Sequence, residues 1–103
     1  MTDRIDKLKQ MLLKSPADAF LLYGLAMEHK KLNLPDEAIG GFRRVIEVDP
    51  LYCYAYYQLG QVQAARGETT LARKIWLDGI AAASKKGDAH AGSELQAAID
   101  DLD

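Results

Sequence analysis

The chain has 103 residues, of which 49% are hydrophobic, and its 13 basic and 15 acidic side chains leave a net charge of −2 at pH 7. This balance excludes the strongly basic surface with which a protein attracts nucleic acid or an anionic membrane. The length allows one domain, and the single cysteine, Cys53, excludes an internal disulfide.

Apolar residues recur at intervals of three and four along the chain, which is the period of a helix. Pro16, Pro35 and Pro50 interrupt this pattern, and Pro35 is followed by Asp36 and Glu37, a composition that suits the first turn of a helix. The pattern predicts helices over residues 3–14, 17–31, 35–48, 52–66, 69–84 and 88–102. No stretch alternates long enough for a strand, so we expect an all-α fold.

The predicted helices form two interleaved sets of three. Equivalent positions are 34 residues apart in the first, third and fifth helices and 36 residues apart in the second, fourth and sixth. Examples are Leu8, Phe42 and Trp76 in the first set, and Tyr23, Leu59 and Leu95 in the second. Such internal repetition predicts stacked helical hairpins.

Two glycines lie inside predicted helices at equivalent positions, Gly24 and Gly60. A glycine in a helix interior costs about 1 kcal/mol relative to alanine. We therefore expect each to lie where its partner helix crosses closely, against the small residues Ala38 and Ala72.

These repeats resemble the tetratricopeptide repeat (TPR), a helical hairpin with aromatic, Leu-Gly, alanine and closing proline positions. The first repeat matches at Phe20, Tyr23, Gly24, Met27, Ala38, Phe42, Val45 and Pro50, and the second at Tyr56, Leu59, Gly60, Gln63, Gly67, Ala72, Trp76, Gly79 and Ser84. The first hairpin turn, "KKLNLP", is two residues longer than the second, and Gln63 replaces an expected aromatic residue.

The resemblance implies a small single-domain TPR protein of bacterial type, in which antiparallel hairpins stack into a right-handed superhelix over residues 1–103. The first repeat covers 17–50 and the second 52–84, and half-repeats at 3–14 and 88–102 act as capping helices. The last helix is expected to turn its apolar side inward, with its acidic side toward water. The inward residues are Ala91, Leu95, Ile99 and Leu102, and the acidic residues are Glu94, Asp100, Asp101 and Asp103.

The sequence contains no recognisable catalytic motif. His29 and His90 have no metal-ligand partner at helical spacing, and one cysteine cannot build a structural zinc site. Cys53 has no nearby histidine to activate it, and we expect a small buried filler there and exposed histidines. We therefore expect no catalytic residue, no metal, no cofactor and no enzyme.

Other classes of partner and compartment are also excluded. The basic pairs at 43–44, 73–74 and 85–86 form no continuous stripe for nucleic acid. No apolar run approaches the roughly 20 residues of a membrane helix. The N-terminus, "MTDRIDKLKQM", is too charged for a signal peptide, so a cytoplasmic protein is expected.

In the TPR family the first helix of each hairpin lines a concave groove. Carried over by register, the groove residues are Leu21, Leu22 and Leu25, then Tyr54, Tyr57, Gln58 and Gln61, then His90, Ser93, Glu94 and Ala97. Chaperone-binding members clamp a terminal carboxylate with lysine, arginine and asparagine. The corresponding positions here are Leu21, Leu25, Gln58, His90 and Glu94, so the clamp is absent.

The resemblance therefore implies an adaptor that binds another protein or a peptide in this groove. The leucines would form an exposed apolar end of the kind that marks interaction surfaces, and the tyrosines would add rigid contact area. One alternative is a homo-oligomeric scaffold subunit in which a second copy covers the same groove. Another is that Leu22 or Leu25 turns inward and belongs to the core.

Overall fold

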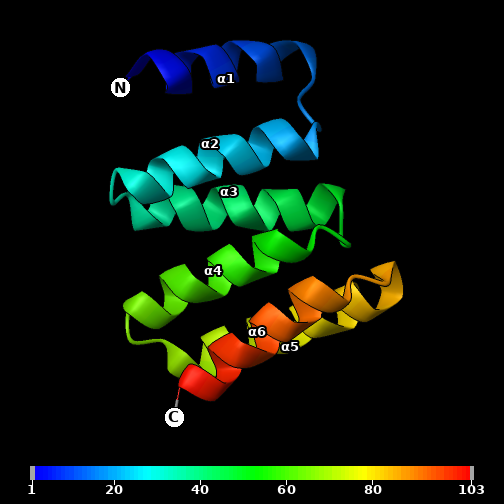
Figure 1. The fold of residues 1–103 in the computed structure, drawn as a ribbon. Helices are drawn as coiled ribbons and strands as arrows, with labels where there is room; N and C mark the ends of the chain where they lie inside the picture. Colours follow the sequence, from blue (N-terminus) through cyan, green and yellow to red (C-terminus); the bar gives the residue numbers. More distant parts are fainter. Residues whose placement is uncertain (1, 103) are drawn as a thin grey trace.

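The computed structural model of the chain describes residues 2–102, which form six α-helices and no strand (Figure 1). The helices are α1 (Thr2–Lys14), α2 (Ala19–Lys31), α3 (Pro35–Val48), α4 (Cys53–Ala65), α5 (Thr69–Lys86) and α6 (Ala89–Asp101). Their ends lie within two residues of the expected positions. The all-α prediction is confirmed.

The helices follow one another down an elongated stack, and the chain termini lie at its opposite ends (Figure 1). The stack measures 39 × 29 × 18 Å. Closely packed hairpins join α2 to α3 and α4 to α5. Helix α4 also contacts α6, and side-chain hydrogen bonds link α2 to α4 and α4 to α6. Helices α2, α4 and α6 therefore line one face of the stack.

Short polar signals set the helix ends. The Asp18 carboxylate accepts a hydrogen bond from Leu21 N at 3.1 Å and so caps α2, and Asp88 caps α6 in the same way. Pro35 is the first residue of α3, as expected. Gly87, with φ of 76°, ends α5 in the left-handed conformation that glycine adopts without strain. Asp103 lies outside the described residues.

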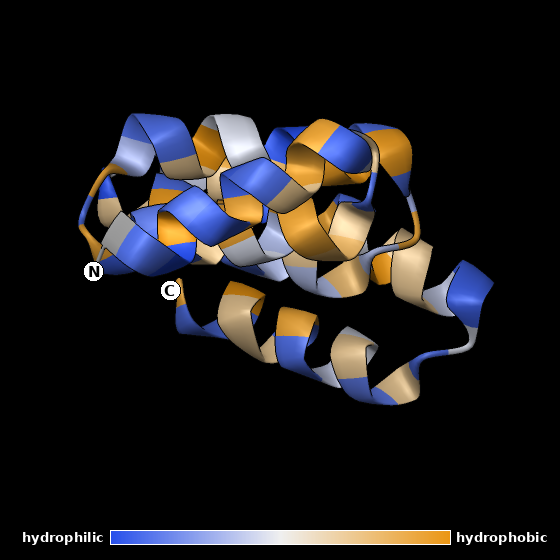
Figure 2. Cartoon of the chain, turned by 90° about the horizontal axis from the view of Figure 1, so that it is seen from above, coloured by the Kyte–Doolittle hydropathy of each residue, from blue (hydrophilic) through white to orange (hydrophobic). Residues whose placement is uncertain are grey.

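The core runs through the stack between the two layers of helices. Phe42 and Val45 are fully buried, and Trp76 and Leu8, the repeat equivalents of Phe42, are buried as well. Seen from above, hydrophobic residues form short bands along the helices, and α6 lies on one side of the stack (Figure 2). The 34-residue interval therefore relates positions that face the core in all three helices of the first set.

The tightest contact at Gly60 is with Trp76, a much larger residue than the expected neighbour Ala72. A Cβ added at Gly60 would lie 2.5 Å from Trp76 Cε2, well inside van der Waals contact. The indole Nε1 donates a hydrogen bond to the Tyr57 carbonyl oxygen at 3.0 Å. The absence of a side chain at Gly60 therefore leaves room for the Trp76 indole to contact the backbone of α4.

At Gly24, by contrast, the expected close crossing against Ala38 is wrong. A Cβ there would meet only the Leu8 methyl groups, with the nearest at the ordinary distance of 3.5 Å. The close approach between α2 and α3 occurs instead at Gly41, where a Cβ would lie 2.8 Å from Ala26 Cβ. Equivalent positions in the sequence thus meet different neighbours, because the side chains at the crossings differ in size.

Gln63, which stands where the repeat has an aromatic residue, is 3% exposed. Its Oε1 atom has no hydrogen-bond partner among the described residues. An unpaired buried polar atom costs about 1–3 kcal/mol. We expect Gln63→Met, which keeps the volume and removes the amide, to raise the free energy of unfolding by about 1 kcal/mol or more. Urea denaturation followed by circular dichroism measures this, and a loss of stability would show that the amide oxygen has a partner.

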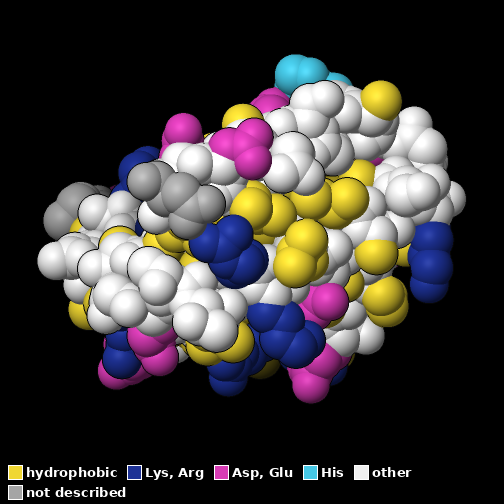
Figure 3. All heavy atoms as spheres, turned by 90° about the horizontal axis from the view of Figure 1, so that it is seen from below, with side chains coloured by type: hydrophobic (Ala, Val, Ile, Leu, Met, Phe, Trp, Pro, Cys, Tyr) yellow, Lys and Arg dark blue, Asp and Glu magenta, His cyan; other side chains and the backbone are white. Residues whose placement is uncertain are grey.

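Helix α6 buries Ala91, Leu95 and Ile99, and Asp100 and Asp101 are exposed. Figure 3 shows the end of the stack formed by α5 and α6, where hydrophobic side chains gather among charged ones. Leu77 of α5 is 52% exposed, and Ile80 and Leu102 are half-buried. The inward and outward sides of α6 are as expected for the described residues, and its role as a cap stays a prediction.

Candidate functional site

The three leucines at the N-terminal half of α2 differ in exposure. Leu21 is only 9% exposed and belongs to the core, whereas Leu22 and Leu25 are half-buried. The expectation that Leu21 faces the groove is corrected, because α2 packs on both α1 and α3 and its flanks are covered. The apolar end of the groove is therefore narrower than expected and consists of Leu22 and Leu25.

The middle of the face is an amide and aromatic surface on α4. Tyr54, Tyr57, Gln58 and Gln61 are all half-buried. The Tyr54 and Tyr57 rings meet edge to face, with centroids 6.3 Å apart. Behind them, Tyr23 packs against Phe42 and Tyr52, with centroids 5.7 and 5.0 Å apart. The two tyrosine rings on α4 therefore contact each other in the absence of a partner.

Lys30, near the end of α2, reaches across to α4. Its Nζ atom donates hydrogen bonds to Gln58 Oε1 and to Gln61 Oε1, the latter at 2.8 Å. Burial lowers the pKa of Lys30. No carboxylate of the described residues lies within ion-pairing distance of this ammonium group. Lys30 is therefore a half-buried cation with neutral partners.

Sequence reasoning missed Lys30. In the string "EHKK" it resembles the solvated basic end of a helix, where lysine favours the dipole. Its neighbour Lys31 does behave in that way, and pairs with Glu28 at 3.6 Å. Only the crossing of α2 over α4 distinguishes the two lysines. The weak signal available in the sequence was the pair of glutamines three residues apart on the facing helix.

The other end of the face carries a carboxylate. Glu94 on α6 accepts a hydrogen bond from the Tyr54 hydroxyl at 3.2 Å, and its Oε1 atom lies 2.6 Å from His90 Nε2. The pKa of Tyr54 is raised by burial and by the nearby Glu94 charge. The Glu94 side chain is 38% exposed, and its Oε2 atom makes no hydrogen bond to the described residues. The structure thus joins Tyr54, His90 and Glu94, as the groove assignment expected.

A hollow of about 260 Å³ adjoins Lys30 at the far end of α4. Arg66, which also lines it, is neutralised by Asp36 at 2.7 Å and Glu68 at 3.6 Å. Lys30 is therefore the cation in this part of the surface that has no acidic partner among the described residues.

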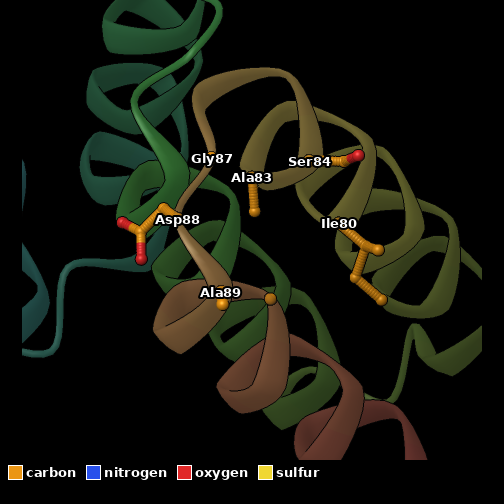
Figure 4. Close-up of a pocket in the computed structure, with 7 residues that line it drawn as sticks. Ile80, Ala83, Ser84, Gly87, Asp88 and Ala89 are labelled. Carbon is orange, nitrogen blue, oxygen red and sulfur yellow. The ribbon is translucent and has the colours of Figure 1, made fainter.

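A second hollow, of about 280 Å³, lies where α5 turns into α6 (Figure 4). It is lined by Ile80, Ala83, Ser84, Gly87, Asp88, Ala89 and Gly92. In Figure 4 the Asp88 carboxylate points away from Ile80, and one of its oxygens caps α6 by accepting from Ala91 N at 3.0 Å. The lining of this hollow is mostly apolar, and one oxygen of its carboxylate is taken up by the cap of α6.

Cys53 packs against Ala91, the neighbour of His90 in the sequence, but among the described residues its thiol is hydrogen-bonded to a backbone carbonyl and not to a histidine. Cys53 is buried, burial raises its pKa, and its Sγ donates to the Leu51 carbonyl oxygen at 3.4 Å. His90 is exposed as expected, whereas His29 is half-buried. The described residues contain no group of three histidine, cysteine or acidic side chains that could hold a metal ion. None of the described helices is both long and apolar enough to span a membrane.

Comparisons with known proteins agree with the repeat pattern. The chain is 31% identical over 99 residues to a TPR repeat-containing protein of Pseudomonas aeruginosa, covering 96% of this chain and 94% of the relative. A crystal structure of a TPR domain protein from Salinibacter ruber is 35% identical, with a TM-score of 0.75, and the match covers 80% of this chain and 91% of that one. The solution structure of a Bordetella parapertussis protein is 28% identical with a TM-score of 0.82, covering 95% and 85%. No family model matches the chain.

Proposed function

Since the chain belongs to the TPR family, we propose that it is a non-enzymatic adaptor which holds a segment of another protein on the face formed by α2, α4 and α6. TPR folds generally mediate contacts between proteins. The observation that carries the proposal is that partly or fully exposed apolar, aromatic, amide and charged side chains of these three helices lie on one face, where the Lys30–Gln61 and Tyr54–Glu94 hydrogen bonds link the helices. These side chains run from Leu22, Leu25 and Lys30 through Tyr54, Tyr57, Gln58 and Gln61 to His90 and Glu94.

The physical character of these side chains supports a protein ligand. Tyr54 and Tyr57 are amphipathic and already oriented, so little side-chain entropy is lost when a partner covers them. Leu22 and Leu25 add apolar area at one end. The charged groups at the two ends give the face a direction, which a flat apolar patch would lack.

The proposal is tested by selecting random peptides on the immobilised protein and then on a groove variant with Leu22→Ser, Leu25→Ser and Tyr57→Ser. Truncating central anchors at an interface commonly costs about 2 kcal/mol or more each, which is enough to abolish a micromolar complex. We expect the variant to lose binding of the selected peptides while its circular dichroism spectrum stays helical. Binding is measured by fluorescence anisotropy.

The matched control for the groove variant carries Met11→Ser and Leu77→Ser, on α1 and α5. Both side chains are 52% exposed and lie outside the α2, α4 and α6 face. This control should bind like the wild type. If the groove variant is folded and still binds normally, the site lies elsewhere on the molecule.

Self-association through the same face is the second outcome of this test. Sedimentation velocity over a range of concentrations would then show a dimer for the wild type and a monomer for the groove variant. If the wild type stays monomeric at all concentrations, self-association is excluded and the adaptor function remains the proposal for this surface.

A further inference from the structure

We propose that the groove selects a segment carrying an acidic side chain for Lys30 and a basic side chain for Glu94, with an apolar residue between them. The inference rests on the proposed function and specifies the partner's chemistry. It differs from the terminal-carboxylate clamp, whose positions here hold Leu21, Leu25, Gln58, His90 and Glu94.

The Lys30 end is prepared for an anion. An ammonium group has three donors, and Gln58 and Gln61 accept two of them. The remaining donor has no acceptor among the described residues. The two amide oxygens fix the position of the ammonium group but leave its charge uncompensated in a partly desolvated place. An incoming carboxylate gains a charge-assisted hydrogen bond there without first breaking an ion pair.

The Glu94 end is prepared for a cation. Of the two carboxylate oxygens, Oε1 faces Tyr54 and His90. The Oε2 atom makes no hydrogen bond to the described residues, and a carboxylate offers about four acceptor sites in all. The hydrogen bond from Tyr54 holds the carboxylate on the groove side of α6. A lysine or arginine of a partner meets this charge already in place.

Helix α4 contacts both charged groups and sets their offset along its own axis. Tyr54 meets Glu94, whereas Gln58 and Gln61 meet Lys30. With a rise of about 1.5 Å per residue, these positions lie roughly 6–10 Å apart along the helix. An extended segment rises about 3.3 Å per residue. For a segment that runs along α4, the acidic and basic residues should therefore be about two or three positions apart.

Tyr57 lies between the two charged ends on α4, and its ring is held against that of Tyr54. An apolar or aromatic side chain of the partner, placed between its two charges, would cover this ring. The pattern acidic, apolar, basic thus follows from the order of Lys30, Tyr57 and Glu94 across the face.

The experiment uses the full chain and phage-displayed random decapeptides as the probe. We expect the selected peptides to share an acidic and a basic residue two or three positions apart, with an apolar residue between. In the double variant Lys30→Glu with Glu94→Lys, binding of these peptides should fall about tenfold or more, because interfacial charge pairs become like-charge contacts. Synthetic peptides with their two charges exchanged should bind this variant better than the wild type.

Matched variants distinguish the effect of the charge at position 30 from the effects of net charge and of unfolding. Lys31→Glu changes the net charge by the same amount as Lys30→Glu, on the same helix, and should leave the selection unchanged. Lys30→Arg should keep the acidic preference, and this variant carries the test if Lys30→Glu proves unfolded. Circular dichroism establishes that each variant is helical.

Two results would overturn the inference in distinguishable ways. If no peptide is selected, the proposed function fails and the inference falls with it. If peptides are selected that lack the charge pair, and their affinity is the same for the wild type and the double variant, the adaptor function stands and the partner chemistry is wrong.

Discussion

Gly60→Ala should destabilise the protein by about 1–3 kcal/mol, although alanine is the better helix former. The new Cβ would lie 2.5 Å from Trp76 Cε2, so the indole has to move. Its movement breaks the hydrogen bond from Nε1 to the Tyr57 carbonyl, a net contribution of about 1 kcal/mol. Overpacking adds about 1–3 kcal/mol, and the gain in helix propensity offsets about 1 kcal/mol.

Gly24→Ala is the matched control, since Gly24 occupies the equivalent position in the first repeat. Its Cβ would meet the Leu8 methyl groups at an ordinary 3.5 Å, so the propensity gain of up to about 1 kcal/mol should be retained. The two variants are thus expected to shift stability in opposite directions.

Thermal melts by circular dichroism measure both glycine variants. A change of 1 kcal/mol corresponds to about 4–8 °C in a domain of this size. Trp76 is the single tryptophan of the chain, so its fluorescence reports directly on the displaced indole. An unchanged emission spectrum in Gly60→Ala, together with a higher melting temperature, would show that Trp76 does not pack against Gly60.

The helices could be predicted from the sequence because local signals define them. Pro35 begins α3 and Asp18 caps α2, and both act within one turn of helix. The repeat interval also predicted which helix positions are equivalent, and Leu8, Phe42 and Trp76 are indeed all buried at such positions. Local order and periodicity thus suffice for the fold class.

The contacts at the crossings could not be predicted in the same way, because they depend on the size of a side chain on another helix. The bulky indole of Trp76 reaches Gly60, whereas the smaller Phe42, at the equivalent position, leaves Gly24 free of such a contact. Leu21 was misplaced for a related reason. The register of a helix fixes the direction of a side chain only to within part of a turn, and the covering by α1 and α3 decides the rest.

The candidate site was predicted in part. The residues of α4 and α6 lie together as expected, because the register of the repeats carries them to one face. The role of Lys30 depends on two glutamines 28 and 31 residues further along the chain. No local sequence pattern predicts such a contact. The positive charge of Lys30 at one end of the groove could therefore be recognised only from the three-dimensional structure.

Deleting residues 88–103 is expected to give a larger loss of stability than any single substitution, and an aggregating chain. Leu95 and Ile99 pack with Ala72 and Trp76 in one buried cluster. Removing a buried leucine or isoleucine side chain costs about 2–5 kcal/mol, and a whole domain is stable by only about 5–15 kcal/mol. The truncated chain would also expose the apolar side of α5 to other copies.

Two point variants show whether the loss comes from the buried side of α6. Leu95→Ala should lower the free energy of unfolding by about 2–5 kcal/mol, because Leu95 is 1% exposed and rests against Gly79. Ala97→Ser, on the exposed side of the same helix, should change it by less than about 0.5 kcal/mol. Urea denaturation gives both values, and sedimentation velocity gives the size of the truncated chain. A truncated chain that is monomeric and melts at the wild-type temperature would show that α6 does not cap the stack. Helix α6 would then serve the protein only by placing Glu94 on the groove face.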